Sequence, residues 1–328
     1  SRRVSVTPLY FDHDTRPDWI EFSDAFDQGL VSVNEVSDSG SVQSVIVSNR
    51  SKQPLVILEG QGLQGAKQNR ALQKTVVVAA QSEQTVPVNC VEQGRWQYRS
   101  RDFSPGDFAS TPRMKVRKSD AFMMDCAVDQ GMVWDEVSQL SHSAGVYSAS
   151  SDLGEVLSVR RKTAPKESKK TTEFKQNFDA SGFLVNAGNV SFIELFGDPA
   201  WAKRALINGW DTWVVQADNK KPKITSLPTH GLRWTAGKSV ALELQWVTEN
   251  LVRGYSATFK ESLIHVFLGK EKRSKQTPLN DDEMSAQAST PLTLVVSSVL
   301  HFPVMRAMLA PPWLSSTPPS PPPPPSIP

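Results

Sequence analysis

The sequence contains only two cysteines, Cys90 and Cys126, among 328 residues. A fold stabilised by several disulfide bonds is therefore excluded, and a reducing, cytoplasmic compartment is expected. An excess of one charge is missing too, because 36 Lys and Arg face 34 Asp and Glu. This balance predicts no strong attraction of the whole chain to nucleic acid or to a membrane surface. The first residues contain no apolar leader, so we expect no secretory signal.

The motifs of the common nucleotide-binding folds are also missing. No G-K-[ST] occurs, which excludes a P-loop, and no helical pattern follows the glycines at 60–65, which excludes a Rossmann fingerprint. The five histidines show no H-x-x-x-H spacing and no C-x-x-C is present, so no metal site is predicted. The motifs leave the cofactor unknown.

Apolar and aromatic residues are plentiful enough for a core, with nine Trp and 14 Phe. Residues 30–90 form short apolar runs separated by Ser, Asn, Gly and Gln, a pattern typical of successive strands. No strand–helix–strand alternation appears there, which favours an antiparallel sandwich or a curled sheet. We therefore predict an α+β fold that is β-rich, with mostly antiparallel sheets, a sandwich-like N-terminal half and a few packed helices.

Two helices are predicted in the second half of the chain. Residues 129–141 place apolar side chains at helical spacing behind Asp129, a good N-cap. A second helix begins with Asp198 as N-cap and Pro199 at the first position, and Gly209 predicts its end. Further strands are expected at 183–185 and 190–195, joined by a hairpin turn at 186–189, and at 240–246, 252–259 and 262–268.

Two segments depart from the globular pattern. Residues 160–175 hold seven Lys or Arg, which predicts a solvated basic loop. Residues 270–328 are polar and then proline-rich, with ten prolines in 311–328, so the domain is predicted to span 1–269. A proline-binding protein is a candidate partner for that tail. Arg306 interrupts the apolar stretch 292–310, so no membrane span is expected.

Two polar clusters follow strands in 54–98 and combine donors, carboxylates and an aromatic ring. Their members are Glu59, Lys67, Gln68, Asn69 and Arg70 in the first, and Glu92, Gln93, Arg95 and Trp96 in the second. Guanidinium groups suit phosphate, and an indole offers a flat apolar face. Such side chains fit an anionic, ring-bearing ligand, but they fit equally a polar network that joins two hairpins.

The segments EGQGLQGAKQNR (59–70) and PVNCVEQGRW (87–96) closely resemble the ARPP domain family, the ARG and rhodanese-phosphatase-superfamily-associated protein domain. Asn89 stands where the family usually has Ser. Further matches are FSDAFDQGLVSVNEV (22–36), DQGMVWDEV (129–137), the hairpin that ends at residues 194–196 and the segment around His265. The resemblance therefore covers about residues 5–269, except for the middle at about 146–180. ARG denotes ADP-ribosylglycohydrolase, and the resemblance therefore implies a role near NAD or ADP-ribose metabolism.

Taken with the side chains, this resemblance predicts binding or processing of a nucleotide or an ADP-ribose-type ligand. The expected ligand-binding residues are Lys67, Gln68, Asn69, Arg70, Gln93, Arg95 and Trp96. The expected acid–base residues are Glu59, Glu92 and His265. Whether the protein is an enzyme is left open.

Three alternatives stay open from the sequence. The two clusters form a buried structural network in a non-catalytic module, or Glu59, Glu92 and His265 hold a metal ion for hydrolysis, or Cys90 is a nucleophile activated by Arg95. In every case we predict that the KQNR turn and the CVEQGRW segment meet in space, because their charges are costly to bury singly.

Overall fold

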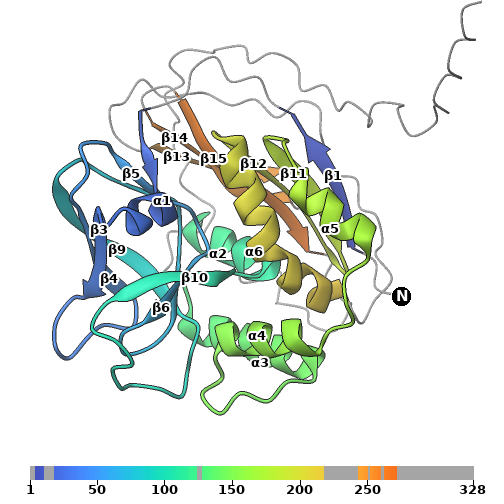
Figure 1. Ribbon diagram of the computed structural model, residues 1–328, viewed down its shortest axis with the longest axis horizontal. Helices are drawn as coiled ribbons and strands as arrows, with labels where there is room; N and C mark the ends of the chain where they lie inside the picture. The colour runs from blue at the N-terminus through green and yellow to red at the C-terminus, as the bar shows by residue number, and fades with distance from the viewer. Residues whose placement is uncertain are drawn as a thin grey trace, which may run out of the picture.

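The structure is a computed structural model that describes residues 4–10, 18–123, 128–217, 243–249, 252–259 and 262–271. Its strands form a closed barrel, a six-stranded sheet and a small three-stranded sheet, with helices packed between and beside them (Figure 1). The predicted α+β, β-rich fold with mostly antiparallel sheets is confirmed. Cys126 and residues 272–328, including the proline-rich segment, lie outside the described residues.

The N-terminal half closes into a barrel, which is the curled form of the expected sheet. Its strands are β3 (Val31–Glu35), β4 (Ser44–Asn49), β6 (Gln61–Gly65), β7 (Arg70–Leu72), β9 (Ser82–Cys90) and β10 (Phe103–Ala109), in the order β10-β3-β4-β9-β7-β6. Alternate residues such as Val33, Val47 and Val86 point inward and are fully buried. Closure leaves the barrel without an exposed strand edge.

A three-stranded sheet lies against the barrel. It contains β2 (Ile20–Glu21), β5 (Leu55–Ile57) and β8 (Val76–Val78), and helix α1 (Phe22–Asp27) follows β2 directly. All three residues of β5 are buried, as the purely apolar run predicts. The strand ends two residues before Glu59, which places that carboxylate at the edge of this sheet.

The six-stranded sheet joins the two ends of the domain. Its strands are β1 (Val4–Leu9), β11 (Gly182–Ala187), β12 (Val190–Phe196), β13 (Glu243–Glu249), β14 (Val252–Phe259) and β15 (Ser262–Glu271), in the order β1-β11-β12-β15-β14-β13. The predicted hairpin is confirmed, with Gly188 at φ +63° in its two-residue turn. The strands predicted near 240–268 are confirmed as well.

Strand β15 continues past the predicted domain end at residue 269. Lys270 and Glu271 pair with Ser191 and Val190 of β12. The carboxylate of Glu271 also lies 3.0 Å from the guanidinium of Arg113. The ordered sheet therefore extends at least to residue 271.

Helix α3 (Gln130–Ala144) confirms the first predicted helix. Asp129 caps it by accepting a 2.9 Å hydrogen bond from the Gly131 amide. The predicted apolar face is buried, and Gly145 ends the helix in a left-handed conformation at φ +64°.

Helix α6 (Pro199–Ala217) begins where predicted but is twice as long as predicted. Asp198 accepts a 2.8 Å bond from the Ala200 amide. Gly209 does not end the helix, so that prediction was wrong. Its missing side chain makes room for the Trp213 ring, which would lie 2.7 Å from a Cβ at this position. The buried apolar face continues through Trp213 and Val215, and the helix continues with it.

The predicted basic loop at 160–175 is also wrong, because most of it is helical. Helix α4 (Leu153–Thr163) is capped by Asp152, and helix α5 (Lys169–Gln176) is capped by Ser168. Arg161 forms ion pairs with Asp107 and Asp211, so its charge is neutralised by tertiary contacts. Charge density alone did not reveal these partners, which are more than 45 residues away in the sequence.

Helices α2 (Pro112–Met123) and α6 lie between the barrel and the six-stranded sheet (Figure 1). One apolar cluster fills the barrel, and another joins α6 to the sheet through rings such as Phe183, Phe192 and Trp213. The barrel, α2, α6 and the sheet meet around a small cavity, which is described below.

Candidate functional site

The KQNR turn and the CVEQGRW segment meet, as predicted from the sequence. Strands β7 and β9 are neighbours, and Arg70 lies opposite Cys90 in their register. The Asn69 amide donates a 2.9 Å bond to Glu92 Oε2, and Gln68 Nε2 donates a 3.3 Å bond to the Gln93 carbonyl. The two segments therefore form one network at the end of the barrel.

Arg95 directs its guanidinium into this network. Its Nε and Nη2 donate bonds of 2.8 and 2.7 Å to the Glu92 carboxylate. The other donors reach backbone carbonyls of Gly65, Ala66 and Gln97 at 3.2, 2.6 and 2.7 Å. Burial alone would raise the pKa of Glu92, but hydrogen bonds from Arg95 and the Asn69 amide outweigh it and lower that pKa. Glu92 and Arg95 both belong to the second motif, and their bonds to Gly65, Ala66 and Asn69 join it to the first motif.

Arg70 and Lys67 are likewise directed at protein partners. The Arg70 side chain is fully buried, donates a 3.0 Å bond to Gln68 Oε1 and lies 3.7 Å from Glu35 Oε1. The Lys67 ammonium donates to the Asp38 carbonyl. Arg70 and Lys67 both lie under the Trp96 ring, 5.7 and 5.5 Å from its centroid. Trp96 itself is 43% exposed, so only its outer surface remains free.

Two residues outside the paired motifs complete the network. Asp152, at the start of α4, accepts bonds of 3.0 and 2.9 Å from Asn69 Nδ2. Gln130, at the start of α3, exchanges bonds of 3.0 and 2.7 Å with the Cys90 backbone. Sequence analysis missed Asp152 because the segment around it falls outside the family resemblance.

Cys90 does not have the surroundings of a nucleophile. The residue is fully buried, and its Sγ lies 2.8 Å from the Glu92 carbonyl and 3.0 Å from Gln68 Oε1. Burial raises the pKa of the thiol, although the nearby Arg70 charge opposes this. A neutral thiol without solvent access is typical of a structural cysteine.

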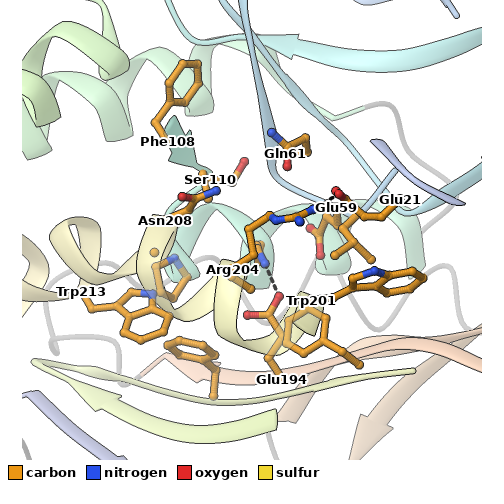
Figure 2. Close-up of a pocket in the computed structure, with 18 residues that line it drawn as sticks. Glu21, Glu59, Gln61, Phe108, Ser110, Glu194, Trp201, Arg204, Asn208 and Trp213 are labelled. Atoms are coloured by element: carbon orange, nitrogen blue, oxygen red, sulfur yellow. Dashed lines mark hydrogen bonds and ion pairs between the residues drawn. The ribbon is translucent and has the colours of Figure 1, made fainter. Parts of the chain in front are cut away.

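A cavity lies elsewhere, between the barrel, α2, α6 and the six-stranded sheet (Figure 2). It has a volume of about 40 Å³, which is room for a few water-sized groups. Its wall combines large rings with charged groups of both signs. The charged lining residues are Glu21, Glu59, Lys115, Glu194 and Arg204. The rings come from Phe108, Phe192, Phe196, Trp201 and Trp213.

Glu59 is the only member of the first predicted cluster that lines this cavity. The residue is 4% exposed, and its Oε1 lies 3.3 Å from Lys118 Nζ. Its Oε2 is buried and has no hydrogen-bond partner. The charge pairing that we expected between Glu59 or Glu92 and Arg70 or Arg95 is formed by Glu92 and Arg95, whereas Glu59 pairs with Lys118.

Lys115 and Lys118 come from one face of α2, because residues three apart lie on the same side of a helix. Both are buried. Burial lowers the pKa of Lys118, while the charge of Glu59 opposes that shift. Lys115 forms an ion pair with Glu194 and lies 5.3 Å from the Phe267 ring centroid. Sequence analysis did not single out either lysine.

Glu194 and His265 form a second buried pair beside Lys115. His265 Nε2 lies 2.9 Å from Glu194 Oε1, so it donates to the carboxylate. His265 Nδ1 contacts the Tyr255 and Thr75 hydroxyls at 2.9 and 3.1 Å. Burial alone would raise the pKa of Glu194, but Lys115 and His265 outweigh it and lower that pKa to about 2. Glu194 is therefore ionised across the physiological range.

Thr75 connects this pair to Glu59. Its hydroxyl accepts a 3.1 Å bond from the Glu59 amide while contacting His265. The structure thus brings together two of the three expected acid–base residues, Glu59 and His265. Glu92 is in the motif network instead, and the described residues contain no cluster of three His, Cys, Asp or Glu side chains suited to a metal ion.

Arg204 borders the cavity from α6 (Figure 2). It forms an ion pair with Glu21 and donates a 2.8 Å bond to Asp24. Its side chain is 33% exposed, in contrast to the buried lysines. Burial raises the pKa of Glu21, and the Arg204 charge opposes that shift.

One signal for this cavity was present in the sequence, since the carboxylate of Glu194 interrupts the otherwise apolar strand SFIELF (191–196).

A comparison with protein families matched residues 1–281 to the ARG and Rhodanese-Phosphatase-superfamily-associated Protein domain, ARPP-1. The chain belongs to the ARPP-1 family. The match includes both motif segments, the cavity and all of the six-stranded sheet. No curated protein and no solved structure matched the chain. Within the described part of the ARPP-1 domain, no helix is long and apolar enough to cross a membrane.

Proposed function

We propose that this ARPP-1 protein binds a nucleotide or an ADP-ribose-type ligand, and that the ribose end of the ligand enters the cavity beside Glu59. The observation that carries the proposal is Glu59, which lines the cavity and whose buried Oε2 has no hydrogen-bond partner. A buried carboxylate oxygen without a donor is costly, and a ligand hydroxyl would satisfy it.

The charges of the cavity favour a hydroxyl-bearing group over a phosphate in its interior. Three carboxylates line it, from Glu21, Glu59 and Glu194, against the two cations of Lys115 and Arg204. Carboxylates bind ribose hydroxyls in many dinucleotide-binding proteins. A sugar hydroxyl next to Glu59 is thus compatible with the local charge, whereas a dianionic phosphate is not.

The small volume limits what enters. A space of about 40 Å³ admits one small group, so the phosphates and the base of a nucleotide would lie outside it. Arg204 is the partly exposed cation at this wall, and its bond to the half-exposed Asp24 is exchangeable. The proposed arrangement places ribose beside Glu59 and phosphate beside Arg204.

A thermal-shift series tests this proposal. ADP-ribose, NAD, AMP, ribose 5-phosphate and inorganic phosphate are compared at about 1 mM, where a ligand with a Kd of about 10 µM adds about 2.7 kcal/mol of stability. We expect ribose-bearing compounds to raise the melting temperature and inorganic phosphate not to. If none of the ribose compounds shifts it, the proposed ligand class is wrong.

A cytoplasmic location, where such ligands are abundant, is part of the proposal and is checked by imaging a fluorescent fusion.

The second candidate function is a non-catalytic interaction module. It is favoured by the buried, mutually paired motif network, which holds Trp96 and Tyr98 on the surface at 43% and 51% exposure. In this alternative the network is a scaffold and the protein acts through partners, including a proline-binding protein for residues 311–328. A peptide of residues 311–328, titrated against purified SH3 and WW domains, tests that partner, and a lack of binding to any domain excludes it.

A further inference from the structure

The Glu59–Lys118 pair is unusually buried for an ion pair. Lys118 is 2% exposed and Glu59 is 4% exposed. The Lys118 ammonium also contacts the Leu72 carbonyl at 3.2 Å and the Ser110 hydroxyl at 3.4 Å. These contacts fix its position behind the cavity wall, since Lys118 itself does not line the cavity.

Stability alone does not account for such a pair. Taking two charges out of water costs several kcal/mol per ion, and well-packed apolar residues often serve as well. Here the carboxylate uses only one oxygen for the lysine and leaves the other without a donor. A buried pair that keeps one acceptor free at a cavity is typical of a functional group held in place by a partner.

We infer that Lys118 is the positioning residue of this site: it balances the charge of the buried Glu59 carboxylate and fixes it at the cavity wall, where Glu59 accepts a hydrogen bond from a hydroxyl group of a sugar-like ligand. The identity of the ligand rests on the proposed function. The effect of Lys118 on Glu59 does not depend on it.

The other charged groups near Glu59 come from every element around the cavity. They are Lys115 from α2, Glu194 from β12, Tyr255 from β14, His265 from β15, Glu21 from β2 and Arg204 from α6. Glu194 is already neutralised by Lys115, and Glu21 by Arg204. Lys118 is therefore the cation that balances Glu59, and removing it leaves a buried carboxylate without a paired charge.

A pH series of thermal unfolding on the full chain tests the effect on Glu59 without any ligand. Lys118→Met leaves the Glu59 carboxylate buried without a cation, so the folded variant should take up a proton that the unfolded chain does not hold. Its stability relative to the natural protein should then fall as the pH increases from acid to neutral. We expect the loss in melting temperature to be about 5 °C greater at pH 8 than at pH 5.

Three further variants make the result specific. Glu59→Gln added to Lys118→Met should remove the extra pH dependence, because no carboxylate is left to titrate. Lys118→Gln keeps the hydrogen bonds without the charge, and it should show the same pH dependence if Lys118→Met does not fold. Lys169→Met, which breaks the exposed Lys169–Glu173 pair, is the matched control and should change little at any pH.

Binding of ADP-ribose separates this inference from the proposed function. Lys118→Met should bind about tenfold more weakly than the natural protein, and Lys118→Arg should recover part of that loss. A loss of stability that is equal at all pH values, and unchanged by Glu59→Gln, overturns the role of Lys118. If ADP-ribose fails to bind the natural protein while the pH effect appears, the ligand class is wrong and the effect of Lys118 on Glu59 stands.

Discussion

Arg95 belongs to the motif that made the family recognisable, yet its side chain serves the fold. From the sequence, its guanidinium and the neighbouring Trp96 ring were both expected to contact a ligand. In the structure Arg95 is 13% exposed and bonded to Glu92, while Trp96 is 43% exposed. We therefore expect Arg95 to contribute more to stability than Trp96.

We predict that Arg95→Ala destabilises the protein by about 3–5 kcal/mol, because the buried Glu92 carboxylate loses its hydrogen-bonded cation and keeps only the half-exposed Arg99, 3.8 Å away. Trp96→Ala should cost less, since much of its ring is already in water. Urea unfolding of both variants, with the exposed Arg101→Ala as control, measures the difference. A smaller loss for Arg95→Ala than for Trp96→Ala would contradict the structural role of Arg95.

Glu194 gives a prediction about acid stability. Its pKa is lowered from 4.5 to about 2 in the folded protein, since Lys115 and His265 outweigh the effect of burial. Its contribution is thus complete above the unfolded pKa and is lost as the pH falls toward 2, amounting to about 3 kcal/mol. Glu194→Gln should be less stable at pH 7 and should lose less stability on acidification. Equal acid sensitivity of both proteins, measured by urea unfolding from about pH 6 to pH 3, would exclude this.

At the scale of elements, the sequence predicted local structure well and distant contacts poorly. The α3 cap at Asp129 and the hairpin turn at Gly188 are determined by neighbouring residues, and both were predicted. The end of α6 was predicted wrongly. Glycine is needed at position 209 because it leaves room for the Trp213 ring, and not because the chain turns there. The cavity was missed for the same reason, as Glu59, Lys118 and Glu194 come from separate elements.

Gly209→Ala tests that explanation of α6. Alanine in a helix interior normally stabilises by about 0.5–1 kcal/mol relative to glycine. Here its Cβ would lie 2.7 Å from the Trp213 ring, so we expect a destabilisation of about 1–3 kcal/mol. Gly131→Ala in α3, where the three atoms nearest to the new Cβ all belong to the Asp129 side chain, is the control. A stabilised Gly209→Ala protein would show that the ring moves aside freely.

The contacts of the last two residues of β15 predict the C-terminal limit of the folded domain. A chain ending at residue 269 loses the pairs of Lys270 and Glu271 with β12, together with the Glu271–Arg113 ion pair. We expect it to melt several degrees below a chain ending at residue 281, the end of the family match. Equal melting temperatures, measured by calorimetry, would restore the domain boundary inferred from the sequence.

At the scale of the whole molecule, β1 and β15 lie in the same sheet, and α2 and α6 connect that sheet to the barrel. The recognisable motifs stabilise the far end of the barrel through Glu92, Arg95 and Asp152. The cavity lies instead where the two halves meet. Apart from Glu59 and Gln61 at the start of the first motif, the motif residues and the proposed ligand site are therefore different parts of the molecule, and this separation is the central claim.

Calorimetric titration of ADP-ribose into the natural protein, Glu59→Gln and Trp96→Ala tests this claim most directly. Glu59 lines the cavity, whereas Trp96 lies on the surface of the motif network, so each variant probes one place. We predict that Trp96→Ala keeps the natural Kd within about threefold and that Glu59→Gln weakens binding by about tenfold or more. Binding that is lost in Trp96→Ala and unchanged in Glu59→Gln would contradict the account and return the ligand site to the motifs.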